Sequence, residues 1–316
     1  MRRIKVIAVI LILLCLVFCA ACQSPAGSGN EGQEQAGGES DSSFAVTDMT
    51  GNTVEFDRPV EKIVVLTAAD CEIIYALGAG DMVVGRGSYC DYPAETADVT
   101  ELQSGSETNI EQIVSLQPDV VFMSTMDQSV DQVEALRQAG MKVVVSEAQN
   151  IDGVYQAIRM VGQVLQKDAE AEDLIKNMQD TFAQVSQQVS EEEEHTVYFE
   201  VSPLEYGLWT AGSNTFMDEI ASMLGLKNIF ADVEGWGEVS EEQVIERNPD
   251  YIISITMYME GETPPEEEIM SRPGWQQVAA VQNQQVWTMD SNMISRPGPR
   301  LAEAAQALYA NVYGDQ

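Results

Sequence analysis

Aromatic side chains stand in the loops that follow several short apolar runs of the chain. Tyr89 and Tyr92 follow one such run, Trp209 and Trp236 lie in two later loops, and Tyr258 follows another run. In open parallel sheets, ligands bind beyond the carboxyl ends of the strands, so these loops are where a site is expected. Rings there suit stacking against a large, flat ligand. For any single ring, packing of its loop on its own lobe is the other interpretation.

No catalytic motif accompanies these rings. The sequence contains no Gly-x-Ser-x-Gly turn, no phosphate-binding loop and no His-Glu-x-x-His, and its single histidine is His195. One imidazole argues against a zinc or manganese centre built from several histidines. We therefore expect a binding protein without a resident cofactor or metal. A secreted α/β enzyme is the alternative of another class.

A repeated motif organises the rest of the chain. The segments NIEQIVSLQPDVVFMSTM, 109–126, and SEEQVIERNPDYIISITM, 240–257, each open with an Asn or Ser and a Gln three residues later, the pattern of a capping box. Each predicts a short helix that ends before a proline, then an apolar strand buried on both faces. Glu111 and Glu242 fall at the second position of the two helices. A carboxylate there complements the helix dipole, which is one reason for its presence.

The repeat predicts two similar lobes, 44–150 and 191–316. A second pair of segments, 72–78 and 219–225, predicts in each lobe a helix closed by a glycine. Strands alternate with helices in both lobes, which implies an α/β fold with mainly parallel sheets. The predicted strands are 63–66, 82–85, 120–123 and 142–145 in the first lobe and 197–200, 251–255 and 285–288 in the second, after a hairpin at 44–56.

Residues 151–190 are predicted to connect the lobes. Their apolar residues recur at three- and four-residue steps, as in Val154, Ile158 and Val161, which predicts one or two amphipathic helices broken, if at all, near Lys167. An unbroken helix of about 35 residues would be about 50 Å long. We therefore expect one long bridging helix that acts as a rod.

The N-terminus has the features of an exported chain. Residues 1–21 carry basic residues, a short apolar run and small residues before Cys22, as a secretory signal does. Ala20-Ala21-Cys22 resembles a bacterial lipobox, with Cys19 where a leucine is usual, so Cys22 would carry a lipid anchor. An ordinary signal cut nearby or an uncleaved anchor is the alternative. Residues 22–43 lack large apolar side chains and are predicted to form a flexible tether outside the cytoplasm, anchored to the cell membrane.

The charge balance excludes one class of partner. The chain has 16 Lys and Arg against 51 Asp and Glu, a formal net charge of -35. Such a surface repels phosphate backbones, so nucleic-acid binding is not expected.

Several segments together resemble a known family. DMTGNTVEF, SYCDYP, NIEQIVSLQPDVV, SEEQVIERNPDYII and SRPGPRL are similar to substrate-binding proteins of ABC importers for cobalamin, haem and ferric siderophores. The resemblance runs from about Phe44 to the C-terminus and is greatest to the cobalamin-binding branch. It implies two α/β lobes bridged by a rigid helix, with the ligand between lobes that move little on binding. The implied partners are a permease and its ATPase, and we expect a monomer.

The resemblance also implies ligand-binding residues. Tyr89, Trp209, Trp236 and Arg296 fall on positions that line the corrinoid pocket, whereas Asn292 stands where that branch has an Asp and Gly105 where it has a Trp. Tyr92 and Tyr258 complete the predicted set. A neutral corrinoid suits an acidic protein whose basic residues near these loops are chiefly Arg86 and Arg296. A ferric siderophore or haem is the alternative ligand.

Glu111 and Glu242 gain a second interpretation from the resemblance. The matching pair in the family lies on top of the lobes and meets arginines of the permease, so docking is the predicted role of both. Cys71 and Cys90 follow the first two strands of the first lobe. They could form a disulfide, bind the metal of the ligand or remain buried thiols, and the sequence leaves these three open.

Overall fold

The computed structural model describes residues 43–105, 107–124, 130–189, 194–256, 258 and 263–314. The predicted signal, 1–21, Cys22 and the tether up to residue 42 lie outside the described residues. Within the described part of the chain, no helix is both long and apolar enough to cross a membrane.

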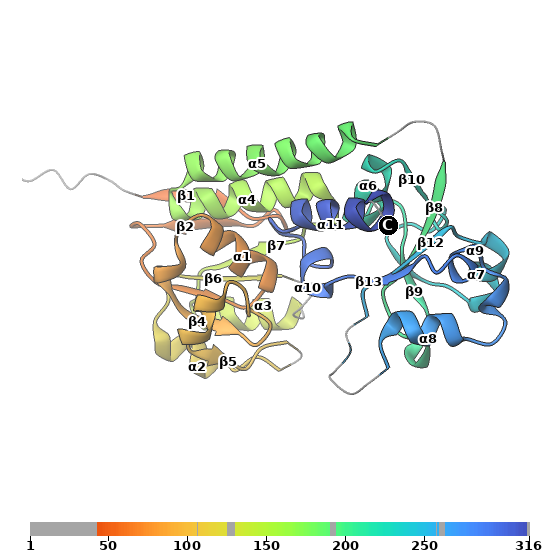
Figure 1. The fold of residues 1–316 in the computed structure, drawn as a ribbon. Coiled ribbons are helices and arrows are strands. Elements are labelled where there is room, and N and C mark those ends of the chain that lie inside the picture. The colour runs from red at the N-terminus through yellow and green to blue at the C-terminus, as the bar shows by residue number, and fades with distance from the viewer. Residues whose placement is uncertain are drawn as a thin grey trace, which may run out of the picture. The chain divides into compact units, whose positions relative to one another are not determined.

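The N-terminal lobe is built on a five-stranded parallel sheet (Figure 1). The order is β5-β4-β3-β6-β7, formed by Glu101–Leu102, Val83–Gly87, Ile63–Val65, Val120–Ser124 and Val143–Ser146. Its helices are α1, Ala68–Ala76, α2, Ile110–Leu116, and α3, Val130–Gln138, with short 3-10 turns at Gly80–Met82 and Ala94–Asp98. An antiparallel hairpin of β1, Phe44–Thr47, and β2, Thr53–Phe56, precedes the sheet, as the sequence predicts.

The C-terminal lobe has a four-stranded parallel sheet and a two-stranded ribbon. The sheet order is β10-β8-β12-β13, formed by Leu226–Asn228, His195–Glu200, Tyr251–Ser254 and Val286–Thr288. The antiparallel ribbon pairs β9, Trp209–Ala211, with β11, Trp236–Glu238. The helices are α6, Phe216–Met223, α7, Glu241–Arg247, α8, Pro265–Ser271, α9, Ala279–Gln282, α10, Ser291–Ile294, and α11, Leu301–Tyr313, with 3-10 turns at Leu204–Tyr206 and Trp275–Gln277.

The connection between the lobes is a pair of packed helices. Helix α4, Ile151–Leu165, ends at Gln166 in the left-handed conformation, and α5, Asp168–Gln187, follows directly. The two helices lie side by side (Figure 1). They approach closely at Gly162, where a Cβ would be 2.7 Å from the Cβ of Ala171, so only glycine fits at this position. The single rod expected across 151–190 is therefore wrong. The break falls where the sequence allows one, and α5 continues into contact with α6 and α11.

One apolar core runs through both lobes. In β3, Ile63 and Val65 face a core that includes α4, α5 and α11, whereas Val64 faces the opposite side of the sheet with α2 and α3. In β8, Phe199 joins the same shared core and Tyr198 faces away from it. Each such side chain contributes about 1.5–3 kcal/mol through burial. A continuous core of this kind restrains the lobes, and small lobe movement on binding stays a prediction.

The repeated motif forms matching structures in the two lobes. Ser240 and Gln243 make a complete capping box at α7, whereas at α2 only the side chain of Asn109 caps, accepting from the amide of Gln112 at 3.0 Å. After each helix an aspartate ties the strand to its neighbour. Asp119 accepts from the Lys62 amide at 2.9 Å, and Asp250 from the Thr196 amide at 2.8 Å.

Candidate functional site

A hollow of the C-terminal lobe lies at the carboxyl ends of β8, β12 and β13. A cavity of about 740 Å³ there is lined by Tyr206, Tyr258 and Asn292, among others. A neighbouring cavity of about 330 Å³ shares Tyr258 with it and reaches Glu200, the last residue of β8. Ligand sites of open parallel sheets form at this edge. The structure therefore brings two predicted residues, Tyr258 and Asn292, to one cavity wall.

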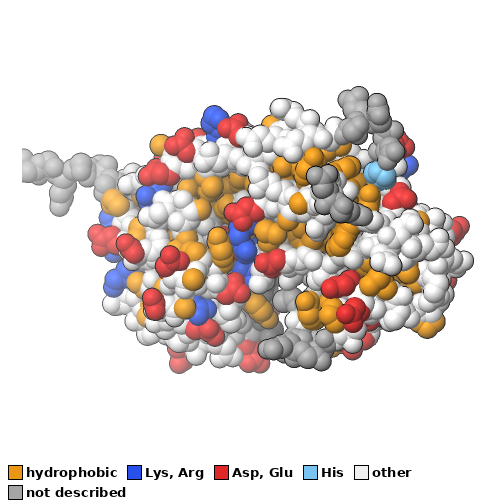
Figure 2. Space-filling model, in the orientation of Figure 1, with side chains coloured by type: hydrophobic (Ala, Val, Ile, Leu, Met, Phe, Trp, Pro, Cys, Tyr) orange, Lys and Arg blue, Asp and Glu red, His pale blue; other side chains and the backbone are white. Residues whose placement is uncertain are grey.

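The walls of these two cavities are acidic. Five carboxylates line them, and no described lining residue is a lysine or arginine. Acidic side chains also outnumber basic ones on the face seen in Figure 2. An anionic ligand would lose its hydration there without gaining a charged partner, so the walls suit a neutral or cationic ligand. The carboxylates are those of Glu200, Glu205, Glu266, Glu268 and Asp290.

A buried arginine holds two of these carboxylates. Arg272 donates to both oxygens of Glu200 at 2.7 and 2.8 Å and to Glu268 at 3.0 Å, and its guanidinium lies 4.6 Å from the centre of the Trp275 ring. Burial alone would lower the pKa of Arg272, but its ion pairs raise that pKa overall, whereas burial raises the pKa of Glu200 despite the same pair. Arg272 is thus occupied by two of the carboxylates that line the cavities.

The loop after β4 presents two tyrosines from the N-terminal lobe. Tyr89 is 65% exposed and Tyr92 42%, whereas Cys90 between them is fully buried. At Gly87 a Cβ would lie 2.6 Å from the carbonyl oxygen of Leu66, so the start of this loop needs glycine. The loop is therefore fixed to the lobe by the buried Cys90 and exposes the rings of Tyr89 and Tyr92 on either side of it.

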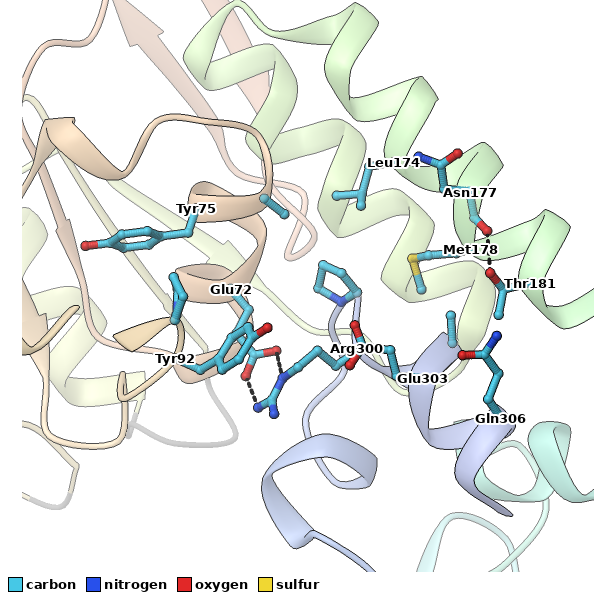
Figure 3. Close-up of a pocket in the computed structure, with 14 residues that line it drawn as sticks. Glu72, Tyr75, Tyr92, Leu174, Asn177, Met178, Thr181, Arg300, Glu303 and Gln306 are labelled. Carbon is cyan, nitrogen blue, oxygen red and sulfur yellow. Dashed lines mark hydrogen bonds and ion pairs between the residues drawn. The ribbon is translucent and has the colours of Figure 1, made fainter. Parts of the chain in front are cut away.

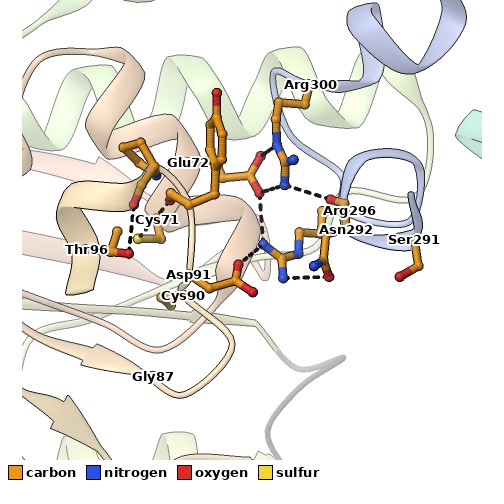
Figure 4. Close-up of polar contacts among 12 residues, drawn as sticks. Cys71, Glu72, Gly87, Cys90, Asp91, Thr96, Ser291, Asn292, Arg296 and Arg300 are labelled. Atoms are coloured by element: carbon orange, nitrogen blue, oxygen red, sulfur yellow. Dashed lines mark hydrogen bonds and ion pairs between the residues drawn. The ribbon is translucent and has the colours of Figure 1, made fainter. Parts of the chain in front are cut away.

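Arg296 joins this loop to the C-terminal segment (Figure 4). It donates to Glu72 of α1 at 3.1 Å, to Asp91 at 2.7 Å and to the side chain of Asn292 at 2.8 Å. Burial alone would lower the pKa of Arg296, but Asp91 and Glu72 raise it overall. The guanidinium thus meets two protein carboxylates, and its predicted contact with a ligand stays a prediction.

Arg300 contacts the same carboxylate of Glu72. It donates to the two oxygens at 2.9 and 2.6 Å and to the carbonyl oxygen of Asn292 at 2.9 Å. Its guanidinium lies over the Tyr92 ring, 4.1 Å from the ring centre. Hydrogen bonding to Glu72 raises the pKa of Arg300. Because the Glu72 side chain is only 2% exposed, it forms a buried ion-pair centre between the lobes.

The Glu72–Arg300 pair also lines a groove of about 390 Å³ between α1, α5 and α11. Figure 3 shows Tyr92 and Arg300 at one side of it and Leu174 and Met178 of α5 at another. Of the predicted ligand-binding residues, only Tyr92 lines this groove. It is therefore distinct from the acidic cavities of the C-terminal lobe.

The two predicted tryptophans share a face of the β9–β11 ribbon. Trp236 pairs with Ala211, two residues beyond Trp209, so both side chains point to the same side. Trp209 is 41% exposed, whereas Trp236 packs edge-on against Phe216 with ring centres 5.6 Å apart. Trp209 is available for stacking. Trp236 is partly buried and packs against the shared core.

Glu111 and Glu242 occupy equivalent, exposed positions. Each is the second residue of its helix, α2 or α7. The amide of its own backbone and the Ser240 hydroxyl lower the pKa of Glu242. Neither residue lines the cavities described above.

Four residues of this region are absent from the predicted set of ligand-binding residues. Tyr206, which is 75% exposed, carries the same signal as the other rings, an aromatic in a loop after a strand. Glu72, Asp91 and Arg300 carry no local signal. The hydrogen bonds that place these three residues at the site join positions 205 to 228 residues apart in the sequence.

Comparisons with known proteins agree with this architecture. Residues 63–293 match the family model described as periplasmic binding protein. The chain is 32% identical over 312 residues to the uncharacterized ABC transporter substrate-binding lipoprotein YvrC of Bacillus subtilis, covering 96% of each chain.

Two solved structures extend the comparison. A possible iron-binding, periplasmic solute-binding protein from Staphylococcus epidermidis is 30% identical with a TM-score of 0.71, covering 81% of this chain and all of that one. The periplasmic vitamin B12 binding protein BtuF of Vibrio cholerae is 25% identical with a TM-score of 0.67, covering 80% and 96%. Both share the two-lobed fold.

Proposed function

The chain belongs to the periplasmic binding protein family as an ABC-transporter substrate-binding protein of the cobalamin, haem and siderophore type, and we propose that its ligand is a corrinoid. Proteins of this class deliver a solute to a permease powered by an ATPase and are not enzymes. The proposed capture site lies between the carboxyl-end loops of the two lobes.

The acidic cavity wall is the observation that carries the choice of ligand. Five carboxylates and no described lysine or arginine line the two cavities, and the nearest buried arginine, Arg272, is paired with Glu200 and Glu268. A corrinoid presents a bulky, largely amide-covered surface without net negative charge. Haem carries two carboxylates and many ferric siderophores are anionic, so both would meet repulsion at this wall. They remain the alternative ligands.

The exposed rings are the proposed contacts. Tyr258 and Tyr206 line the larger cavity, Tyr89 and Tyr92 face solvent from the other lobe, and Trp209 stands on the ribbon. Asn292 also lines that cavity, and Arg296 and Trp236 complete the proposed set.

Delivery requires docking and an anchor. Glu111 and Glu242 are the proposed contacts with arginines of the permease, one from each lobe. Cys22 is the proposed lipid anchor. It would hold residues 44–316 outside the cytoplasm at the cell membrane. The name of the Bacillus subtilis relative, a substrate-binding lipoprotein, supports this proposal.

Substitution of the cavity rings tests the site. Purified protein would be mixed with cobalamin, haemin and ferric siderophores, and absorption spectra and thermal shifts recorded. Tyr258→Ala should weaken binding of the ligand found by roughly tenfold, because a stacked ring is lost. Val114→Ala, which removes an exposed apolar side chain from α2, is the control. Unchanged affinity in Tyr258→Ala would move the site away from this cavity.

A further inference from the structure

Two buried cysteines lie beside the Glu72 ion-pair centre. Cys71 belongs to α1, which follows β3, and Cys90 belongs to the loop that follows β4, so neighbouring parallel strands bring them together. Both are fully buried in the shared core. No other described residue is a cysteine.

Each thiol contacts the backbone of the other's segment. The Cys71 sulfur lies 3.9 Å from the carbonyl oxygen of Tyr92, two residues beyond Cys90. The Cys90 sulfur lies 3.6 Å from the carbonyl oxygen of Val65, at the end of the strand that leads to Cys71. Both sulfurs are free thiols in the structure. In the view of Figure 4, Cys71 is drawn above Asp91 and Cys90 below it.

The position of the pair has a consequence for the loop. Glu72 and Asp91 directly follow the two cysteines, and both accept hydrogen bonds from Arg296. Tyr89 and Tyr92 flank Cys90. A covalent bond between the sulfurs would therefore fix the two carboxylates that hold Arg296 and the two rings of the N-terminal wall.

We propose that Cys71 and Cys90 are joined by a disulfide bond in the exported protein, tying the loop of residues 88–93 to α1. The proposal rests on export, which is part of the proposed function. Outside the cytoplasm, disulfides form and persist. Both cysteine side chains are 0% exposed, so neither sulfur is accessible to the metal of a bound chelate.

The bond forms by exchange with a disulfide-bonded donor, such as a disulfide oxidase or a low-molecular-weight disulfide. One cysteine thiolate attacks the donor, forms a mixed disulfide and releases one donor thiol. The second cysteine thiolate attacks that mixed disulfide and releases the other donor thiol. The protein loses two protons and two electrons, and the donor is reduced to two thiols. Interaction with Cys71 and burial raise the pKa of Cys90, so exchange belongs to the folding stage, before the thiols are enclosed.

Thiol trapping tests the bond directly. Exported protein would be denatured and alkylated with and without prior reduction, then mapped by peptide mass. We expect Cys71 and Cys90 to resist alkylation until reduced, and their peptides to appear linked, two hydrogen atoms lighter than the reduced pair. Alkylation of both without reduction, a bond between two chains, or an adduct on one cysteine overturns the proposal.

The state of the N-terminus separates this failure from that of the proposed function. Free thiols in a chain whose signal has been removed overturn the disulfide and leave the transport role standing. Free thiols in an unprocessed, retained chain contradict the disulfide and export together.

Thermal unfolding supplies a second measurement. Reduction should lower the Tm of the wild-type protein by about 5 °C or more. The disulfide restricts the unfolded chain by closing a loop between Cys71 and Cys90, and breaking it raises the conformational entropy of the unfolded state. Cys71→Ala/Cys90→Ala should show no change on reduction. Wild-type protein whose Tm is unaffected by reductant contradicts the proposal.

Discussion

In each lobe, a glutamate at the matching position of the repeated helix accepts hydrogen bonds from a segment outside that helix, but the two sets of contacts differ in strength. Glu72 of α1 accepts from two guanidiniums, those of Arg296 and Arg300. Glu219, at the matching position of α6, accepts from one backbone amide, that of Ile151 at the start of α4, at 2.7 Å. The repeat thus places a glutamate at the same position of each lobe, and the hydrogen-bond donors around that glutamate determine how much the contact stabilises the fold.

The walls that the lobes present also differ. The N-terminal lobe offers Tyr89 and Tyr92 on a loop anchored by ion pairs. The C-terminal lobe offers cavities lined by carboxylates and by Tyr206 and Tyr258. A duplicated scaffold can therefore keep its strands and helix caps while the loops at its carboxyl ends take on separate tasks.

The largest expected effect concerns docking, where the lobes should act alike. Glu111→Ala/Glu242→Ala should abolish uptake and leave ligand affinity intact, because both residues are exposed and outside the cavities. Calorimetry and vesicle transport on the same proteins measure both. Glu246→Ala, an exposed carboxylate at the other end of α7, is the control and should transport normally. Normal transport by the double variant would return both residues to a helix-dipole role.

Stability should reveal the difference between the lobes. Glu72→Ala should lower the free energy of unfolding by about 3–5 kcal/mol, because it leaves two mostly buried guanidiniums without their shared partner. Glu219→Ala should cost only about 1–2 kcal/mol, since one backbone hydrogen bond is lost. Urea unfolding of the ligand-free variants measures both. Equal losses would show that the two cross-lobe contacts are equivalent.

The smallest effect is a pH dependence at Glu242. Its folded-state pKa is lowered, so it contributes stability above the ordinary glutamate pKa and loses it as pH falls through the lowered value. Glu242→Gln should therefore show a slightly smaller fall in stability between about pH 6 and about pH 3 than the wild-type protein. Glu111→Gln serves as the matched variant from the other lobe. A steeper acid-induced fall in Glu242→Gln would contradict the sign.

Local patterns predicted the repeated parts well. The helix caps at Asn109 and Ser240, the apolar strands and the α/β class depend on neighbouring residues, and the structure confirms them. The reversal between α4 and α5 was harder to foresee, because the left-handed residue there is Gln166, where a glycine would have given a signal.

The site depends on distant contacts, which limits what sequence can predict. Exposed rings at Tyr89 and Tyr258 follow from their place after strands. Arg296 was predicted as a ligand contact from resemblance, yet its carboxylate partners lie in α1 and in the loop after β4. Spacing along the chain contains no information on such pairs.

The central claim is that the lobes capture a bulky metal chelate without net negative charge. Calorimetric titration of the purified protein with cobalamin, and separately with an anionic ferric siderophore, tests this claim most directly. We expect saturable binding of one cobalamin per chain and no measurable heat from the siderophore. Tight binding of the siderophore with no binding of cobalamin would contradict it.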